Sequence, residues 1–337
     1  MKKNNVLIIA EIGVNHNNKL SIAKKLINVA KQSGANFVKF QTYKTENLVR
    51  KFTATTSYQK NNLKKKIDQF EMLKKLELSE TNHKKIIQYC KKKKIIFLSS
   101  PFDIESLNLL FKFKIFTIKI ASGEITNFAL LKAIAKKAKK IFLSTGMSNI
   151  NEISDALNIL INNGAKKKNI TILHCHSDYP TKLIDVNLLA MCEIKKNFKM
   201  DVGYSDHTTG NETAIAAVAL GAKVIEKHIT LKKNMFGPDH AASMEPKNFT
   251  NFVISIRNAE ILLGRNIKEP TKAEIKIKKL VRKSIVAKKN INKGELFSEE
   301  NMTCKRPEGG ISSIYWDKVI GKKSKKSFKT DQFIYLK

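Results

Sequence analysis

Short apolar runs rich in β-branched residues alternate with longer amphipathic stretches from residue 6 to residue 230. Runs with the length of strands lie at 7–11, 37–42, 95–100, 116–122, 141–146, 170–175, 201–206 and 224–230. Helical patterns separate them at 20–33, 82–93, 104–113, 128–137, 150–163, 186–196 and 211–220. Parallel neighbouring strands need crossovers of this length, and strands buried on both faces are continuously apolar. The pattern therefore favours an α/β fold with a closed (β/α)8 TIM barrel over a doubly wound open sheet.

The remaining segments predict additions to this barrel, followed by a second domain with a different residue pattern. The long insertion 45–78 predicts a loop and helix at the barrel mouth, and a helix at 246–263 ends at Gly264. We expect residues 1–264 to form the barrel and the hydrophilic segment 265–281 to be a linker. Short β-like pieces and turn residues at 282–337 predict a small second domain rich in β-structure.

Length and composition narrow the class of protein. The chain has 337 residues, of which 42% are hydrophobic, enough for a sizeable core. Its apolar runs fall short of the roughly 18 residues of a membrane span, and Val6–Ala10 is too short for a signal peptide. Its four cysteines are scattered without zinc spacing. We therefore expect a cytoplasmic protein with reduced thiols and no membrane partner.

The net charge of +34 suggests nucleic acid as a partner, but the kind of basic residue argues against it. Only five of the 63 basic residues are arginine, the side chain that base readout favours, and the lysines are spread along the whole chain. No aromatic platform for bases stands out. We expect a solvated basic surface that attracts an anionic substrate, and we disfavour a basic nucleic-acid-binding protein.

Ionisable residues stand at the ends of the expected strands, where a barrel of this kind carries its active site. Lys39 and Lys119 interrupt apolar runs, although buried strands avoid lysine unless it is paired or functional. Further polar residues stand at the ends of these and other strands or just after them: Glu11, Gln41, Ser122, Glu124, Ser144, Ser177 and Tyr179. Either lysine alone could be half of a structural ion pair. The whole set at one mouth predicts an active site.

Two histidines point to a metal ion. His207 and His228 follow the last two strands, so they share one edge of the sheet. Imidazole is the commonest ligand for a divalent metal, and two such ligands leave coordination positions open, as in catalytic sites. The alternative is a pair of hydrogen-bonding surface histidines.

Together these groups suggest a reaction. Two lysines, several hydroxyl groups and the Ser-Thr-Gly turn at 144–146 can hold a phosphate or carboxylate. Glu11 and Glu124 can transfer protons, and a metal ion can polarise a carbonyl oxygen. This set favours carbon–carbon bond formation between a phosphorylated anion and an aldehyde. A Schiff-base aldolase using Lys39 or Lys119 is the rival mechanism.

Ten motifs, in this order, resemble the bacterial sialic acid synthase family. They are AEIGVNHNN, VKFQTYK, SSPFD, KIASGEITN, LSTGMSN, LHCHSDYPT, GYSDHTTG, EKHIT, GPDHAAS and KRPEGGIS, and they cover nearly the whole chain. The resemblance implies a domain-swapped homodimer of (β/α)8 barrels, each with a C-terminal antifreeze-like (SAF) domain. It also implies condensation of phosphoenolpyruvate with an N-acetylated mannosamine to give a nine-carbon sialic acid and phosphate, with Mn²⁺, or Mg²⁺ or Co²⁺, as cofactor.

The resemblance also implies residue roles. It makes His207 and His228 the metal ligands and places Glu124 beside the water that is added. It assigns phosphoenolpyruvate to Lys39, Lys119, Ser144 and Ser205, with Gln41 and Tyr179 beside it, and we also expect Ser122 to bind substrate. Glu11 and Asp239 would face the sugar, and Arg306 would reach its N-acetyl group across the dimer. Ser177 departs from the family pattern, because some members have asparagine there, which puts that phosphate contact in doubt.

The motifs leave the acceptor sugar open. GPDHAAS is closer to the synthases of N-acetylneuraminic and N,N'-diacetyllegionaminic acid than to pseudaminic acid synthase, which is the alternative within the family. The stretches 74–86 and 164–175 are more similar to legionaminate synthases. No residue decides between N-acetylmannosamine and 2,4-diacetamido-2,4,6-trideoxymannose.

Overall fold

A computed structural model describes residues 6–56, 59, 62 and 68–336 of the chain. The chain divides into two compact units, Met1–Gly264 and Arg265–Lys337. Each unit has its own apolar core, and each is described by itself below.

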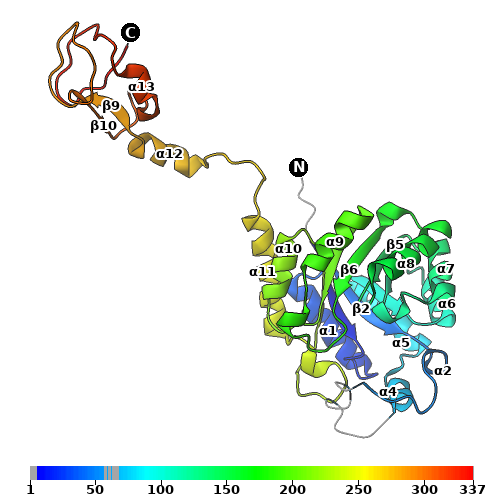
Figure 1. The fold of residues 1–337 in the computed structure, drawn as a ribbon. Helices are drawn as coiled ribbons and strands as arrows, with labels where there is room; N and C mark the ends of the chain where they lie inside the picture. The colour runs from blue at the N-terminus through cyan, green and yellow to red at the C-terminus, as the bar shows by residue number, and fades with distance from the viewer. Residues whose placement is uncertain (1–5, 57–58, 60–61, 63–67, 337) are drawn as a thin grey trace. The chain divides into compact units, whose positions relative to one another are not determined.

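Unit 1 is a closed barrel of eight parallel strands (Figure 1). The strands are β1 (Leu7–Gly13), β2 (Phe37–Thr42), β3 (Ile96–Pro101), β4 (Thr117–Ile120), β5 (Lys140–Ser144), β6 (Ile170–Cys175), β7 (Asp201–Asp206) and β8 (Val224–His228). The last strand pairs with the first, with Glu11 opposite His228, so the barrel is closed and the open sheet is excluded. The predicted fold class is confirmed.

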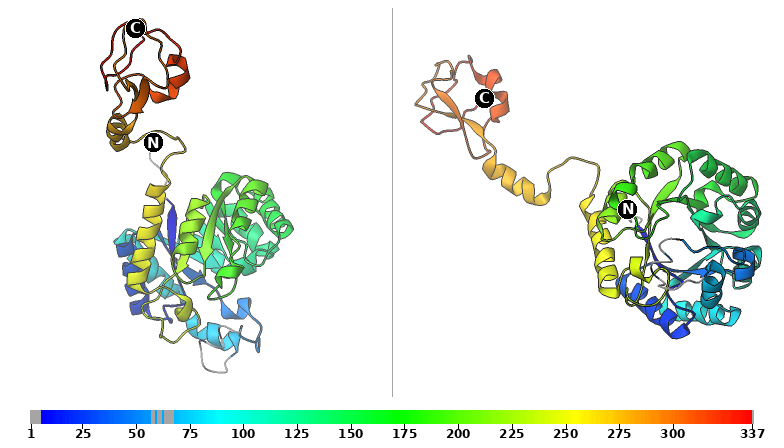
Figure 2. Two further views of the ribbon diagram at one scale, coloured as in Figure 1. Left: turned by 60° about the vertical axis from the view of Figure 1, so that its left-hand side comes forward. Right: turned by 60° about the horizontal axis from the view of Figure 1, so that its bottom comes forward.

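Helices surround the strands, as the right-hand view of Figure 2 shows. They are α1 (Leu20–Ser33), α2 (Thr45–Leu48), α4 (Gln69–Leu76), α5 (Glu80–Lys93), α6 (Ile104–Lys112), α7 (Phe128–Lys137), α8 (Ile150–Asn162), α9 (Leu189–Phe198), α10 (Glu212–Ala219) and α11 (Pro246–Leu262). Side-chain caps fix several starts, such as Ser79 before α5 and Asp103 before α6. The expected insertion contains α2 and α4, and its residues 57–58, 60–61 and 63–67 lie outside the described residues.

Apolar side chains fill one end of the barrel interior, at the level of the first residues of the strands. Successive strand residues point to opposite faces, so one face of each strand packs on the helices and the other points inward. The inward cluster consists of Ile9, Phe37, Leu98, Phe142, Leu173 and Val224. Gly203 of β7 lies among them, where a Cβ atom would come within 2.4 Å of the Val224 carbonyl oxygen. These side chains fill that end of the barrel interior, so the open space lies beyond them, toward the carboxyl ends of the strands.

Unit 2 combines a short antiparallel sheet with turns and one longer helix. It contains α12 (Lys272–Val281), β9 (Ser284–Ala287), β10 (Met302–Lys305) and α13 (Trp316–Val319). A capping box at Thr271 and Glu274 begins α12, so a helix occupies much of the segment expected as a linker. Among the residues that the structure describes, none of the helices has both the length and the apolar character of a membrane span.

Candidate active site

A polar layer lies directly above the apolar cluster of the barrel. The residues two positions after those of the apolar cluster are Glu11, Lys39, Ser100, Ser144, Cys175 and Glu226, on the same six strands. Because strand side chains repeat with a period of two, these six also point inward. The interior therefore changes within one layer from apolar to charged and hydroxylic.

This polar layer forms the floor of a cavity of about 210 Å³. Ten of the predicted site residues line it: Glu11, Lys39, Gln41, Lys119, Ser122, Ser144, Tyr179, Ser205, His207 and His228. They come from seven of the eight strands and the loops that follow them. The structure thus brings the residues predicted from separate strand ends into one enclosed space.

The charged groups of the cavity contact one another. Lys39 Nζ lies 2.9 Å from Glu226 Oε1 and 3.4 Å from Glu11 Oε2. Lys119 Nζ lies 3.7 Å from the same Oε1 of Glu226, which also accepts a hydrogen bond from Ser205 Oγ at 2.7 Å. All of these side chains are buried. Glu226 is therefore the centre of the charged cluster.

Burial distributes the protons unevenly over this cluster. It raises the pKa of Glu11 to about 8, and the nearby Lys39 does not offset it. Burial also opposes the charge of Glu226, but Lys119 and Lys39 outweigh it and hold the pKa of that carboxyl well below its usual range. Burial lowers the pKa of Lys119 to about 8. Burial therefore favours the neutral form of Glu11, whereas the two lysines favour the ionised form of Glu226.

Several polar atoms of the cavity are buried without a hydrogen-bond partner among the described residues. They are Oε2 of Glu11, Oγ of Ser100, Oγ of Ser144, Oε2 of Glu226 and Nδ1 of His228. Native proteins satisfy almost all buried polar atoms, because leaving one unpaired costs about 1–3 kcal/mol. A group of such atoms facing one cavity indicates a site that a polar ligand completes.

The two histidines have the properties of metal ligands. The His207 Nδ1 atom lies 2.6 Å from the carbonyl oxygen of His176, so Nδ1 donates and Nε2 keeps a lone pair. Burial lowers the pKa of His207 to about 4 and lowers that of His228 well below its usual value, so both rings are neutral. The ring centres are 5.6 Å apart, a separation that one ion with bonds of about 2.1 Å to each ring can bridge.

The donor set leaves room for further ligands on such an ion. In the described part of the chain, no group of three or more histidine, cysteine, aspartate or glutamate side chains forms a metal site. An ion held by His207 and His228 would therefore keep several coordination positions for water or substrate, as catalytic sites do. The residues present fit a catalytic metal and not a closed structural one.

Four predicted residues do not line this cavity. Glu124 lies in a short 3₁₀ turn, half-buried, where burial raises its pKa and Asn127 donates a hydrogen bond to it. Ser177 is near the lining residue Ser122, since a Cβ atom on Gly146 would lie 2.7 Å from the Oγ of Ser177 and 2.8 Å from that of Ser122. Asp239 is buried, and burial raises its pKa to about 6. Arg306 is an exposed residue of unit 2.

Six lining residues were absent from the predicted set, and three of them carry a hydroxyl, thiol or carboxyl group: Ser100, Cys175 and Glu226. Glu226 is the most important, because it contacts both lysines. Its signal was present in the sequence, since it stands two residues before His228 and therefore on the same face of β8. Counting alternate residues along the strand from His228, rather than considering the residue type, identifies Glu226 as an inward-facing side chain.

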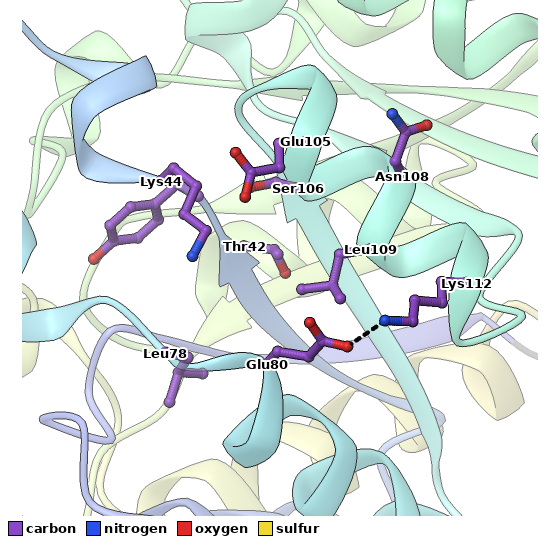
Figure 3. A pocket seen from close by; sticks show the side chains of 10 residues that line it. Thr42, Lys44, Leu78, Glu80, Glu105, Ser106, Asn108, Leu109 and Lys112 are labelled. Atoms are coloured by element: carbon purple, nitrogen blue, oxygen red, sulfur yellow. Dashed lines mark hydrogen bonds and ion pairs between the residues drawn. The ribbon is translucent and has the colours of Figure 1, made fainter.

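A second cavity, of about 240 Å³, lies outside the barrel and serves as a contrast (Figure 3). It is bounded by the starts of α5 and α6 and by residues that end or follow β2, and Lys112 pairs with Glu80 at 2.7 Å on its wall. Within the described residues, none of its lining side chains has a buried polar atom without a hydrogen-bond partner. It therefore lacks the unsatisfied polar groups that mark the barrel cavity.

Known proteins resemble the chain along nearly its full length. Residues 26–268 match the NeuB family, and residues 282–337 match the SAF domain. The N,N'-diacetyllegionaminic acid synthase of Campylobacter jejuni is 52% identical, with 99% of both chains covered. That of Legionella pneumophila is 42% identical, with 93% of this chain and 89% of the relative covered. The crystal structure of N-acetylneuraminic acid (sialic acid) synthetase from Leptospira borgpetersenii, in complex with citrate, is 32% identical with a TM-score of 0.70, covering 81% of this chain and 90% of that one.

Proposed function

The chain belongs to the NeuB family, and from that premise we propose that it is a sialic (nonulosonic) acid synthase. It condenses phosphoenolpyruvate with an N-acetylmannosamine-type sugar and water, and it releases phosphate. Identity of 52% with a legionaminic acid synthase along the whole chain supports this activity. The structural observation that carries it is the enclosed cavity in which two lysines, two carboxyl groups and unpaired hydroxyls face one another.

We propose 2,4-diacetamido-2,4,6-trideoxymannose as the acceptor, with N,N'-diacetyllegionaminic acid as the product. Both legionaminic acid synthases compared above cover most of the chain, at 52% and 42% identity. N-acetylmannosamine is the alternative acceptor. A side-by-side assay of the two sugars decides between them, and a higher kcat/KM with N-acetylmannosamine would overturn this choice.

The anion cradle of the proposed enzyme is the wall around Lys39 and Lys119. The two ammonium groups and the Ser144 hydroxyl can donate hydrogen bonds to the phosphate or carboxylate of phosphoenolpyruvate, whereas the Ser205 hydroxyl donates its one proton to Glu226. Burial strengthens these interactions, because water no longer competes for the donors. Gln41 and Tyr179 line the same cavity.

His207 and His228 are the proposed ligands of the divalent metal ion, which supplies a Lewis acid for the carbonyl oxygen of the sugar. The lone pair on Nε2 of His207 and the unpaired Nδ1 of His228, judged against the described residues, support this assignment. The His176 carbonyl holds the His207 ring in the orientation that such a ligand needs.

The carboxyl groups provide proton transfer in the proposed reaction. C3 of phosphoenolpyruvate attacks the aldehyde carbon of the sugar, water adds at C2, and phosphate leaves by C–O cleavage. Glu11, which burial keeps protonated at neutral pH, can give a proton to the aldehyde oxygen. Glu124 can orient the water and accept its proton. Asp239 is the second acidic residue, with Glu11, that we propose to face the sugar.

We further propose that the enzyme is a domain-swapped homodimer in which Arg306 binds the sugar of the partner's barrel. The loop that carries Arg306 is firmly built, because the buried Ser284 Oγ donates to the Pro307 carbonyl and accepts from the amides of Gly309 and Gly310. Mixed dimers of an Arg306→Ala chain and a Lys39→Met chain test this. If each site uses Arg306 of the partner, one site of a mixed dimer keeps both Lys39 and Arg306. Activity near one quarter or more of wild type therefore supports the proposal, and inactive mixed dimers contradict it.

An assay of phosphate release tests the central proposal. Release should require phosphoenolpyruvate, the sugar and a divalent ion, and EDTA should stop it. His207→Ala and His228→Ala should each abolish turnover. A Schiff-base aldolase would instead retain activity in EDTA and be inactivated by borohydride with substrate.

A further inference from the structure

Three of the groups that the proposed function assigns to phosphoenolpyruvate converge on one carboxylate of the protein. Lys39 Nζ and Ser205 Oγ lie 2.9 Å and 2.7 Å from Oε1 of Glu226, and Lys119 Nζ lies 3.7 Å from the same atom. Glu226 is buried, and its other oxygen, Oε2, has no hydrogen-bond partner among the residues described. The carboxylate therefore joins the donors of the anion cradle at a single point.

Two ammonium groups in a buried cavity repel each other strongly, because little water screens them. A carboxylate between them offsets this repulsion and fixes the direction of both long side chains. Lysine has three N–H donors. Lys39 directs a donor at Glu226 and lies 3.4 Å from Glu11 Oε2 without a hydrogen bond to it, and Lys119 reaches the Ile120 carbonyl at 3.4 Å and faces Glu226. Each ammonium group therefore keeps a donor for an incoming anion.

We propose that Glu226 is a positioning residue, which holds Lys39 and Lys119 in place for the anion of phosphoenolpyruvate and is itself held by the hydroxyl of Ser205. This inference rests on the proposed function. The substrate then meets donors that are already arranged, so little side-chain freedom is lost on binding. The Oε1 atom organises the donors, and the substrate binds to the N–H groups that remain.

A purely structural ion pair is the competing explanation, and the chain contains one for comparison. Lys227 Nζ lies 2.8 Å from Asp206 Oδ2, and both side chains are buried against the helices. That pair lies outside the barrel cavity. Asp206→Asn is therefore a matched control for loss of one carboxylate charge beside a buried lysine.

Glu226→Gln tests the proposal in the full-length enzyme. Phosphoenolpyruvate binding is measured by calorimetry without sugar in a Mn²⁺-containing buffer, together with the KM of each substrate and the thermal midpoint. We expect the Kd for phosphoenolpyruvate to rise between about tenfold and a hundredfold, as for loss of hydrogen bonds to a charged group. The KM of the sugar should change less than threefold, and Asp206→Asn should leave the Kd within about twofold of wild type.

An unchanged or tighter Kd in Glu226→Gln overturns the proposal, because the carboxylate would then only stabilise the fold or compete with the substrate. Should that variant not fold, Glu226→Asp keeps the charge but withdraws it by one methylene. A raised Kd at a wild-type thermal midpoint supports positioning, and a wild-type Kd overturns it. A wild-type enzyme that does not bind phosphoenolpyruvate would contradict the proposed function itself.

Discussion

Glu226 and Lys227 are neighbours on β8, both are buried, and both contact a residue of opposite charge, yet their surroundings differ. Successive strand residues point to opposite faces, so Glu226 faces the barrel interior and Lys227 faces the surrounding helices. The two ion clusters are therefore separated by one layer of backbone. Their comparison distinguishes a buried charge that builds the fold from one that builds a site.

The outer cluster satisfies its own groups. Lys227 donates to Asp206 and to the carbonyl oxygen of Thr208, and its ammonium group lies 5.6 Å from the centre of the Phe252 ring. Oδ1 of Asp206 accepts hydrogen bonds from both the amide and the hydroxyl of Thr208. Neither side chain has a buried polar atom without a partner among the described residues. A ligand would therefore find no unsatisfied polar atom on Lys227 or Asp206, judged within the described residues.

The inner cluster is left incomplete. One oxygen each of Glu11 and Glu226 and the hydroxyls of Ser100 and Ser144 are buried without hydrogen-bond partners in the described part of the chain. The difference teaches that a lysine in an apolar strand does not by itself indicate function. Function is indicated by several unsatisfied polar atoms that face one cavity; the Tyr204 hydroxyl and Asn15 Oδ1, which also lack partners among the described residues, do not line it.

Lys227→Met should have the largest effect on stability. It leaves the Asp206 carboxylate buried without its cation, which costs about 3–5 kcal/mol in the free energy of unfolding. Urea unfolding of the variant and wild type measures this. The double variant Lys227→Met/Asp206→Asn should recover most of the loss, because the amide keeps an oxygen for the Thr208 hydrogen bonds. A double variant as unstable as the single one would show that the pair is not the cause.

Lys39→Met should have its main effect on catalysis. Removing one donor of an anion cradle lowers kcat/KM by about 10²–10³-fold. The loss of unfolding free energy should be smaller than for Lys227→Met, since Glu226 retains Lys119 and Ser205. Steady-state kinetics with phosphoenolpyruvate as the varied substrate measures the effect. A kcat/KM within tenfold of wild type would contradict the proposed role of the inner cluster.

Asp239→Asn should make the protein more stable at neutral pH. Burial raises the pKa of this carboxyl from 3.8 to about 6, so the folded state binds the proton more tightly than the unfolded state. Stability is therefore lost as the pH rises from about 4 to about 6, and the full cost above pH 6 is about 3 kcal/mol. The amide cannot ionise, so it avoids this cost.

Unfolding free energies at pH 4 and pH 7 measure the Asp239 effect. The advantage of Asp239→Asn should be close to its full size at pH 7 and nearly absent at pH 4. Asp206→Asn serves as the control of opposite sign, because it breaks the outer ion pair and destabilises the protein. An Asp239→Asn variant less stable than wild type at pH 7 would show that the carboxylate is satisfied in the fold.

Most of the barrel could be predicted because its strands are apolar runs of clear length. The helices predicted at 20–33 and 128–137 coincide with α1 and α7, three predicted strands coincide with β2, β6 and β7, and no other strand limit differs by more than two residues. All eight predicted strands supply side chains to the cavity through the same rule of alternating faces. The closed barrel, rather than an open sheet, was predicted from the eight successive units of strand and helix.

The details that could not be predicted lie on loops or depend on distant contacts. Glu124, Ser177 and Asp239 follow strands, where no period of two fixes the direction of a side chain. Arg306 belongs to the second unit, so its role depends on how that unit is placed. Glu226 stands at a strand end in the sequence but was given no role, because the adjacent letters Glu-Lys do not reveal which of them faces inward unless they are counted from Val224.

Ser99 and Ser100 repeat the comparison on β3 with a smaller effect. Ser99 donates to the Phe40 carbonyl at 3.0 Å and shares a 2.6 Å hydrogen bond with Thr42, whereas Ser100 Oγ lines the cavity without a partner among the described residues. Ser99→Ala should therefore cost about 1 kcal/mol of unfolding free energy and leave the KM for phosphoenolpyruvate unchanged.

Ser100→Ala should show the reverse. Removing a buried hydroxyl that the fold does not satisfy should leave the unfolding free energy unchanged or raise it slightly, while loss of one neutral hydrogen bond to substrate raises the KM for phosphoenolpyruvate about fivefold. Urea unfolding and steady-state kinetics on both variants measure the pair of effects. If Ser100→Ala loses stability and Ser99→Ala loses affinity, the unsatisfied atoms do not mark the site, and the distinction between the inner and outer faces of the barrel fails.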